Sequence, residues 1–223
     1  TRRRLTAGPA AAEARPLSSP SQADPAMARQ TERIPLEQPG PGTRHELTLH
    51  RYGTRGADRK AYLQASLHAD ETPAMMAAHH LLTLLEEADS KGLIRGEIVV
   101  VPYANPIGLS QWVNDTQLGR YELHGGGNFN RGYPDLTEPL AALLEGKLGD
   151  DAAANVAAVR AAIPQVLAGI RPRKALDALR LALAREALTA ELALDLHCDD
   201  DSLMHLFLIP QHWPEAAPLA AEL

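Results

Sequence analysis

The stretch YLQASLHADETPAMMAAHHLLTLLEE, residues 62–87, joins two apolar patterns through a histidine and two carboxylates. The segment at 61–67 has the composition of a buried strand. The pattern from about Pro73 to Asp89 carries an apolar stripe at helical spacing and predicts an amphipathic helix. His68 and Glu71 stand between them, and burying such groups without partners costs free energy. The turn is therefore either solvated or holds a cation.

The rest of the chain extends the same strand and helix pattern. Further segments have the composition of buried strands, at residues 97–103, 192–196 and 203–209. Alanine- and leucine-rich patterns predict helices over residues 139–148 and 152–189, the second broken near Pro164 and Pro172. This alternation predicts an α/β domain with a mixed, largely parallel sheet flanked by helices.

The two ends of the chain differ in composition from its middle. Residues 1–43 are rich in Ala, Pro, Arg, Ser and Gly and have few large apolar side chains, so we expect them to be disordered. Met27 offers a natural start, which would make residues 1–26 extraneous. Residues 44–223 are predicted to form one domain. Because the chain stops soon after a candidate strand, we expect this domain to be incomplete at its C-terminal end.

Composition excludes several classes of protein. With 223 residues, 45% of them hydrophobic, the chain can build one sizeable core. A net charge of −6 without a basic stripe argues against nucleic acid as a partner. The single cysteine, Cys198, permits no internal disulfide and favours a reducing compartment. No secretory signal or apolar run of membrane-spanning length is evident, so we expect a cytoplasmic protein without a membrane partner. The oligomeric state stays open, and a homo-oligomer is compatible with the sequence.

Two predicted strand ends are followed by residue types that commonly ligate metals. His68 and Glu71 lie where a strand ends and a helix begins, which is where open α/β sheets place their sites. Imidazole and carboxylate together suit zinc, whereas a solvated turn with Glu71 near the helix N-terminus is the alternative. His197 follows another predicted strand and offers a third ligand. Cys198 would point to the opposite face of that strand, which argues against a thiol nucleophile.

A third polar segment follows the strand at 97–103. It contains the glycines 125–127 and then Asn130 and Arg131. Arginine can grip a carboxylate through two parallel hydrogen bonds, although an ordinary turn with a surface arginine is the alternative. The HGGG sequence at 124–127 is similar to an esterase oxyanion loop, but the chain has no Gly-x-Ser-x-Gly nucleophile elbow.

These motifs together resemble a known family. The matching residues are HADE at 68–71, NPIG at 105–108, NFNR at 128–131 and DLH at 195–197. With them, residues 47–210 resemble the succinylglutamate desuccinylase/aspartoacylase family, a branch of the zinc carboxypeptidase superfamily. The resemblance implies a zinc carboxypeptidase-like fold for the domain at 44–223.

The resemblance also implies site residues. One zinc ion per chain would be held by His68, Glu71 and His197, with a bound water as nucleophile. Asn130 and Arg131 would hold a carboxylate of the substrate.

The implied reaction is hydrolysis of the amide bond in an N-acyl amino acid or a similar small carboxylate-bearing amide. Arg120 is a candidate to polarise the scissile carbonyl. The alternatives are a zinc carboxypeptidase that acts on peptides and a non-catalytic relative that binds a metal or a carboxylate.

The sequence departs from the family pattern at several points. Asn128 stands where the family usually has an aspartate, and an asparagine there would orient a histidine ligand with less charge. Asp70 stands where many relatives carry asparagine. The family's general base is a glutamate several dozen residues beyond His197, and Glu215 and Glu222 come too soon to match it. The general-base glutamate is thus not present in this sequence, which we expect to bind metal but to hydrolyse poorly.

Overall fold

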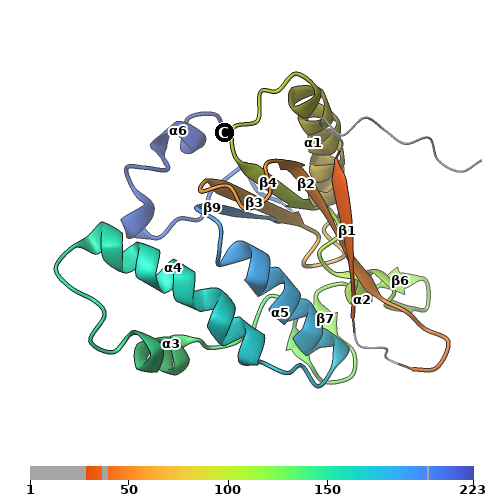
Figure 1. Cartoon of the computed structure of the whole chain (residues 1–223). Coiled ribbons are helices and arrows are strands. Elements are labelled where there is room, and N and C mark those ends of the chain that lie inside the picture. Colours follow the sequence, from red (N-terminus) through yellow and green to blue (C-terminus); the bar gives the residue numbers. More distant parts are fainter. Residues whose placement is uncertain (1–28, 37–39, 200) are drawn as a thin grey trace, which may run out of the picture.

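A mixed sheet forms the centre of the computed structural model, which describes residues 29–36, 40–199 and 201–223 (Figure 1). Its five strands lie in the order β1-β2-β4-β3-β9. They are β1 (Gln30–Pro35), β2 (Glu46–Gly53), β3 (Lys60–Ala65), β4 (Glu97–Val101) and β9 (Leu192–Leu196). The β1–β2 and β2–β4 pairs are antiparallel, and the β3–β4 and β3–β9 pairs are parallel. The mixed sheet flanked by helices is confirmed.

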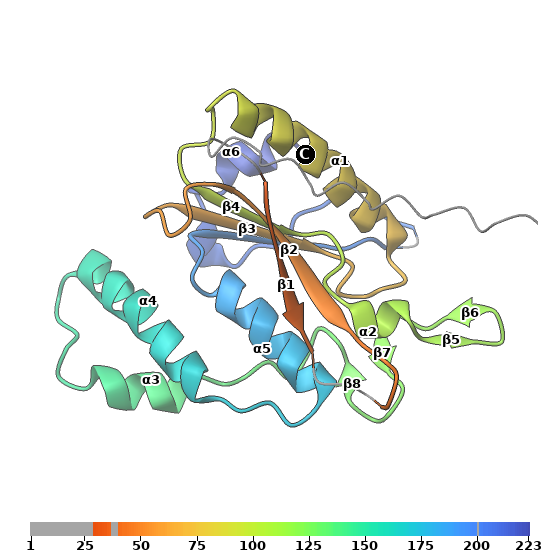
Figure 2. The same ribbon diagram turned by 45° about the vertical axis from the view of Figure 1, so that its right-hand side comes forward.

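Helices cover both faces of this sheet. One face packs against α1 and the other against α5, with α4 and α3 outside α5 (Figures 1 and 2). The helices are α1 (Thr72–Ser90), α2 (Pro106–Leu109), α3 (Thr137–Leu144), α4 (Ala152–Gly169), α5 (Ala175–Ala187) and α6 (Ala217–Ala220), with a 3₁₀ turn at Pro210–His212. Two small hairpins pair β5 (Trp112–Val113) with β6 (Thr116–Gln117) and β7 (Tyr121–Glu122) with β8 (Gly127–Asn128).

The alternation of side chains along the strands divides the core. Val99 and Val101 belong to the cluster that includes Leu179 of α5, whereas Val100 packs with Leu82 of α1. Successive residues of a strand point to opposite faces, so a strand covered on both sides is apolar throughout. This explains why the central segments read as continuous hydrophobic runs.

Two expectations about the helical region have different outcomes. The break near Pro172 is confirmed, because residues 170–174 link α4 to α5. The break near Pro164 is wrong, since α4 continues through it to Gly169. Proline removes one helical hydrogen bond, but Ile163 and Leu167 on either side of it lie in one core cluster, and this packing holds the helix together.

Two extended segments also differ from expectation. Residues 30–35, expected to be disordered, form the edge strand β1, and Ile34 packs against the main core. Residues 1–28 and 37–39 lie outside the described residues. The candidate strand at 203–209 is wrong: this segment is irregular, and Phe207 is 89% exposed. Within the described part of the chain it does not pair with the edge strand β9, at which the sheet ends.

Helix α4 changes one expectation about membranes. It has 18 residues with a mean hydropathy of 1.2, so it is long and apolar enough to cross a membrane by length and composition. The expectation that no segment approaches this length is therefore wrong. One such helix is weak evidence for a membrane span, and the cytoplasmic location stays a prediction.

The turn after β3 contains a strained residue. Ser66 has a φ of 64° and is fully buried, and its Oγ has no hydrogen-bond partner among the described residues. Glycine adopts this φ without a steric cost and carries no buried hydroxyl. We expect Ser66→Gly to raise the free energy of unfolding by about 1 kcal/mol, measured by urea denaturation. Ser66→Ala keeps the strain and should gain less, and a destabilised Ser66→Gly variant would contradict this account.

Candidate metal centre

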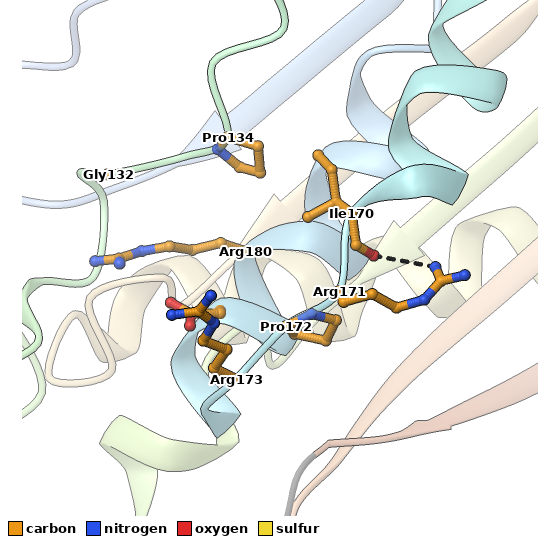
Figure 3. Close-up of a pocket in the computed structure, with 8 residues that line it drawn as sticks. Gly132, Pro134, Ile170, Arg171, Pro172, Arg173 and Arg180 are labelled. Carbon is orange, nitrogen blue, oxygen red and sulfur yellow. Dashed lines mark hydrogen bonds between the residues drawn. The ribbon is translucent and has the colours of Figure 1, made fainter.

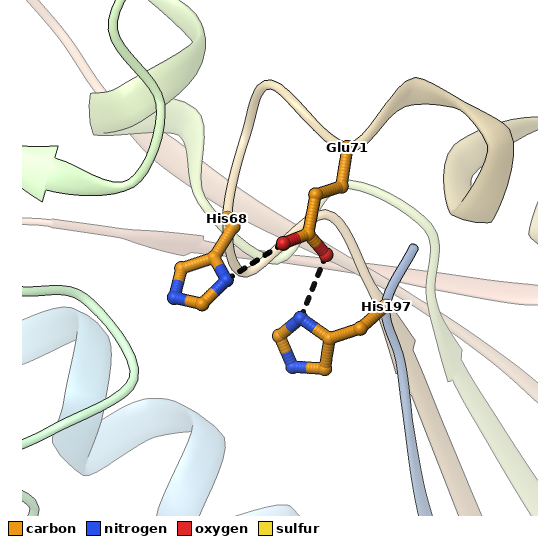
Figure 4. A group of neighbouring side chains, drawn as sticks. All are labelled: His68, Glu71 and His197. Atoms are coloured by element: carbon orange, nitrogen blue, oxygen red, sulfur yellow. Dashed lines mark hydrogen bonds and ion pairs between the residues drawn. The ribbon is translucent and has the colours of Figure 1, made fainter. Parts of the chain in front are cut away.

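The carboxyl ends of two adjacent strands and the start of α1 meet at one place (Figure 4). His68 follows β3, Glu71 is the N-cap of α1, and His197 follows β9. Strands β3 and β9 are parallel neighbours, with Ala65 opposite Leu196. Residues that follow these two strands therefore come to the same edge of the sheet, although they are far apart in the sequence.

The three side chains form a compact donor set. The Nδ1 atom of His68 lies 2.9 Å from Oε1 of Glu71, and that of His197 lies 2.7 Å from Oε2. One donor atom from each residue lies within 4.8 Å of the others. His68 and Glu71 are buried, whereas the His197 side chain is 32% exposed. Two imidazoles and one carboxylate, open on one side, match a zinc site that keeps a position for water.

The Nε2 atom of each histidine, on the side of the ring away from Glu71, lies close to a side-chain oxygen atom. Nε2 of His68 lies 3.0 Å from Oδ1 of Asn128, and Nε2 of His197 lies 2.9 Å from Oδ2 of Asp195. A proton on Nε2 would be donated to these oxygens and would leave Nδ1 free to ligate a metal. Metal-binding histidines are oriented in this way by outer partners. The residues present therefore fit a metal ion.

The surroundings shift the pKa values of two site residues. Burial raises the pKa of Glu71, but hydrogen bonds from the Cys198 N–H and from both histidines outweigh it, and the net pKa is lowered. The hydrogen bond to Asp195 raises the pKa of His197 to about 9, against the effect of burial. Without a metal the site therefore combines an anionic Glu71 with a protonated His197.

Arg120 reaches the donor set from the loop between β6 and β7. Its Nη1 donates to Oε1 of Glu71 at 3.1 Å and lies 3.4 Å from Nδ1 of His68. The side chain is half exposed. The structure thus brings the candidate arginine beside two of the proposed ligands, with its positive charge at the open edge of the site.

Asn130 and Arg131 are placed differently. Nδ2 of Asn130 lies 3.2 Å from Nε2 of His197, so the asparagine belongs to the site. Arg131 is exposed and its Nη1 donates to the main-chain oxygen of Asn130. Among the described residues it makes no hydrogen bond to the three donor side chains.

Some residues support the site although the sequence analysis assigned them no role in it. Asp195 orients His197, and the Cys198 N–H donates to Oε2 of Glu71 at 3.0 Å. Asn105 is fully buried, caps α2 through Gly108 N–H, and donates to the main-chain oxygen of Leu67 at 2.8 Å. The Asn-Pro pair at 105–106 is a helix-start signal that could have revealed this cap.

Comparison with known proteins supports the resemblance found in the sequence. The model of the succinylglutamate desuccinylase/aspartoacylase catalytic domain matches residues 57–161, which include His68, Glu71, Arg120 and Asn130. The resemblance to the succinylglutamate desuccinylase/aspartoacylase family is confirmed. No curated protein matches the chain.

Solved structures of the succinylglutamate desuccinylase/aspartoacylase group share the fold. A family protein from Shewanella amazonensis is 27% identical over 76% of the chain, with a TM-score of 0.60. A protein from Shewanella frigidimarina assigned to the same group is 22% identical over 78% of the chain, with a TM-score of 0.61. The chain spans 47% of the length of each of these two proteins.

Asn128 stands where the resemblance leads us to expect an aspartate, and its Oδ1 lies 3.0 Å from Nε2 of His68. We expect Asn128→Leu to weaken zinc binding by about 10- to 100-fold, because Nε2 of His68 loses its acceptor. Asn128→Asp should bind zinc at least as tightly as the native chain, since a carboxylate makes the ring a better donor. Competition with a chromophoric chelator measures both affinities. Equal affinities in the two variants would show that Asn128 does not orient His68.

Proposed function

We propose that this chain carries the metal site of a zinc-dependent hydrolase that cleaves the amide bond of an N-acyl amino acid or a similar small carboxylate-bearing amide. The observation that carries the proposal is the donor set of His68, Glu71 and His197 at the carboxyl ends of parallel strands. The match to the family's catalytic domain supports the same reaction class. Because the chain spans about half the length of its structural relatives, the activity is proposed for the full-length polypeptide.

The residues of the site would have separate roles in metal binding and in stabilising the developing negative charge. A zinc ion, when bound, would lower the pKa of a water molecule towards neutrality and act as a Lewis acid towards the amide carbonyl. His68, Glu71 and His197 would hold the ion. Arg120, at 3.1 Å from Glu71, would place a positive charge where the amide oxygen becomes negative.

Substrate binding and proton transfer fall to other residues. Arg131 is exposed, so its guanidinium has room to bind a substrate carboxylate, with Asn130 between it and His197. Glu71 and Asp195 already accept hydrogen bonds from the site histidines. We therefore assign neither of them as the general base, and the resemblance gives that role to a glutamate beyond this sequence.

The test compares substrates with and without a carboxylate. The zinc-loaded full-length polypeptide is assayed with N-acetyl and N-succinyl amino acids and with the matching amino acid amides, and the released amine is measured. We expect the free acids to be preferred by about tenfold or more, and Arg131→Met to raise KM for the acids alone. Arg95→Met, another exposed arginine, is the control.

Two results would contradict the proposed function. Preferred cleavage of longer peptides would favour a carboxypeptidase. A zinc-loaded protein that hydrolyses none of these amides would favour a non-catalytic binder.

A further inference from the structure

A cavity lined by three arginines, the arginine pocket, lies beside the linker between α4 and α5 (Figure 3). Its volume is about 300 Å³, and its lining includes Arg171, Arg173 and Arg180. Gly132 and Pro134, from the loop after β8, form part of the opposite wall. None of the proposed metal ligands lines this cavity, so it is separate from the metal centre.

Arg180 is the buried residue of the arginine pocket. It is 8% exposed, and its Nη2 donates to the main-chain oxygens of Gly126 at 3.3 Å and of Asn128 at 2.9 Å. Its Nε is buried without a hydrogen-bond partner in the described part of the chain. No carboxylate of the described residues lies within 4.0 Å of this guanidinium. Burying a charge without a counter-ion costs free energy, so binding of an anion next to Arg180 would be favourable.

The other deeply buried arginine, Arg51, has its charge compensated by carboxylates. Arg51 is 6% exposed and forms ion pairs with three carboxylates at 2.6 to 3.0 Å. These belong to Glu32, Glu97 and Glu186. The fold therefore provides counter-ions for Arg51 from within the chain, whereas the hydrogen-bond partners of Arg180 among the described residues are main-chain carbonyl oxygens.

Two further arginines add to the positive charge of the arginine pocket. Arg171 and Arg173 are both exposed, and neither forms an ion pair with a carboxylate of the described residues. Pro172 between them restricts the backbone of the linker. Asp177 is the one acidic residue of the lining. The lining thus carries three positive charges against one negative charge.

We propose that the arginine pocket binds a small oxyanion, a phosphate or a carboxylate group. Guanidinium groups bind such groups through paired hydrogen bonds, and the cavity has the volume of a small-molecule site. Arg180 also connects this site to the metal centre, because it holds the main chain of Asn128, whose side chain contacts His68. An anion bound there would neutralise the buried charge of Arg180, for which the described residues provide no carboxylate.

Calorimetric titration with inorganic phosphate and with succinate, at constant ionic strength set by chloride, tests this proposal. We expect saturable binding of at least one of them, both to the native chain and to His197→Ala, which removes a metal ligand. Binding of phosphate alone would identify a phosphate site, and binding of succinate alone a carboxylate site.

Two exposed, adjacent residues provide the matched pair of variants. Arg173→Ala should weaken binding by about tenfold or more, because it removes a charge-assisted hydrogen bond. Lys174→Ala removes the same charge from a residue outside the lining and should change the affinity by less than about threefold. No saturable binding beyond chloride, or equal weakening in both variants, would overturn the proposal.

Discussion

Replacing either His68 or His197 by alanine is expected to lower the zinc affinity of this chain by at least about 100-fold. Each histidine would supply one of the three protein ligands, and each ligand contributes about 3 kcal/mol to zinc binding in typical sites. The two residues lie 129 positions apart in the sequence, at the ends of neighbouring parallel strands. Equal losses in both variants would show that one ion joins the two strand ends.

The control for this prediction is another histidine of the same segment. His80 lies on α1 and is exposed, so His80→Ala should leave the zinc affinity unchanged. Competition with a chelator gives all three affinities, and circular dichroism checks that the variants are folded. Zinc retained by both His68→Ala and His197→Ala would mean that the residues form a hydrogen-bonded turn and no metal site.

The second large effect is the dependence of metal binding on pH. The raised pKa of His197, about 9, means that a metal must displace a proton from this ring at neutral pH. The apparent zinc affinity should therefore rise by about tenfold per pH unit between pH 7 and pH 9. Zinc titrations at several pH values in weakly coordinating buffers measure this slope.

The metal-free chain should show the opposite trend in stability. The pKa of His197 is higher in the folded chain than its ordinary value of about 6.5. Its contribution to stability is thus fully present below about pH 6.5 and is lost as pH rises through about 9. Denaturation in the presence of a chelator at several pH values measures this loss.

Asp195→Asn provides the matched control for both trends. The hydrogen bond to Asp195 is the main cause of the raised pKa of His197, and asparagine keeps the oxygen but removes the charge. Above pH 7, the zinc affinity and the stability of the metal-free chain should both depend less on pH in this variant. If zinc affinity and stability did not depend on pH in the native chain, or depended on pH equally in Asp195→Asn, Asp195 would not be the cause of a raised pKa of His197.

Local sequence explains why much of the site could be predicted. His68 and Glu71 are three residues apart, so one turn brings them together. His197 could be added because the carboxyl ends of parallel strands share one edge of the sheet. The central strands β3 and β4 were recognisable as apolar runs, since helices cover both faces of the sheet there.

Other features depend on contacts that the sequence does not encode locally. The strand at 30–35 is stabilised by pairing with β2, although its composition is similar to that of the preceding tail. Arg120 contacts Glu71, 49 residues away in the sequence, only through the folded arrangement of the chain. The arginine pocket joins the α4–α5 linker to the loop after β8, a contact that periodicity cannot reveal.

The most direct test of the central claim is a crystal structure of the zinc-loaded chain with anomalous data collected at the zinc edge. We expect one anomalous peak per chain, bound by a Glu71 oxygen and by the Nδ1 atoms of His68 and His197. The Nε2 atoms should remain within hydrogen-bond distance of Asn128 and Asp195. No peak at this position, or a zinc ion bound through Nε2, would contradict the account of how the fold builds its metal centre.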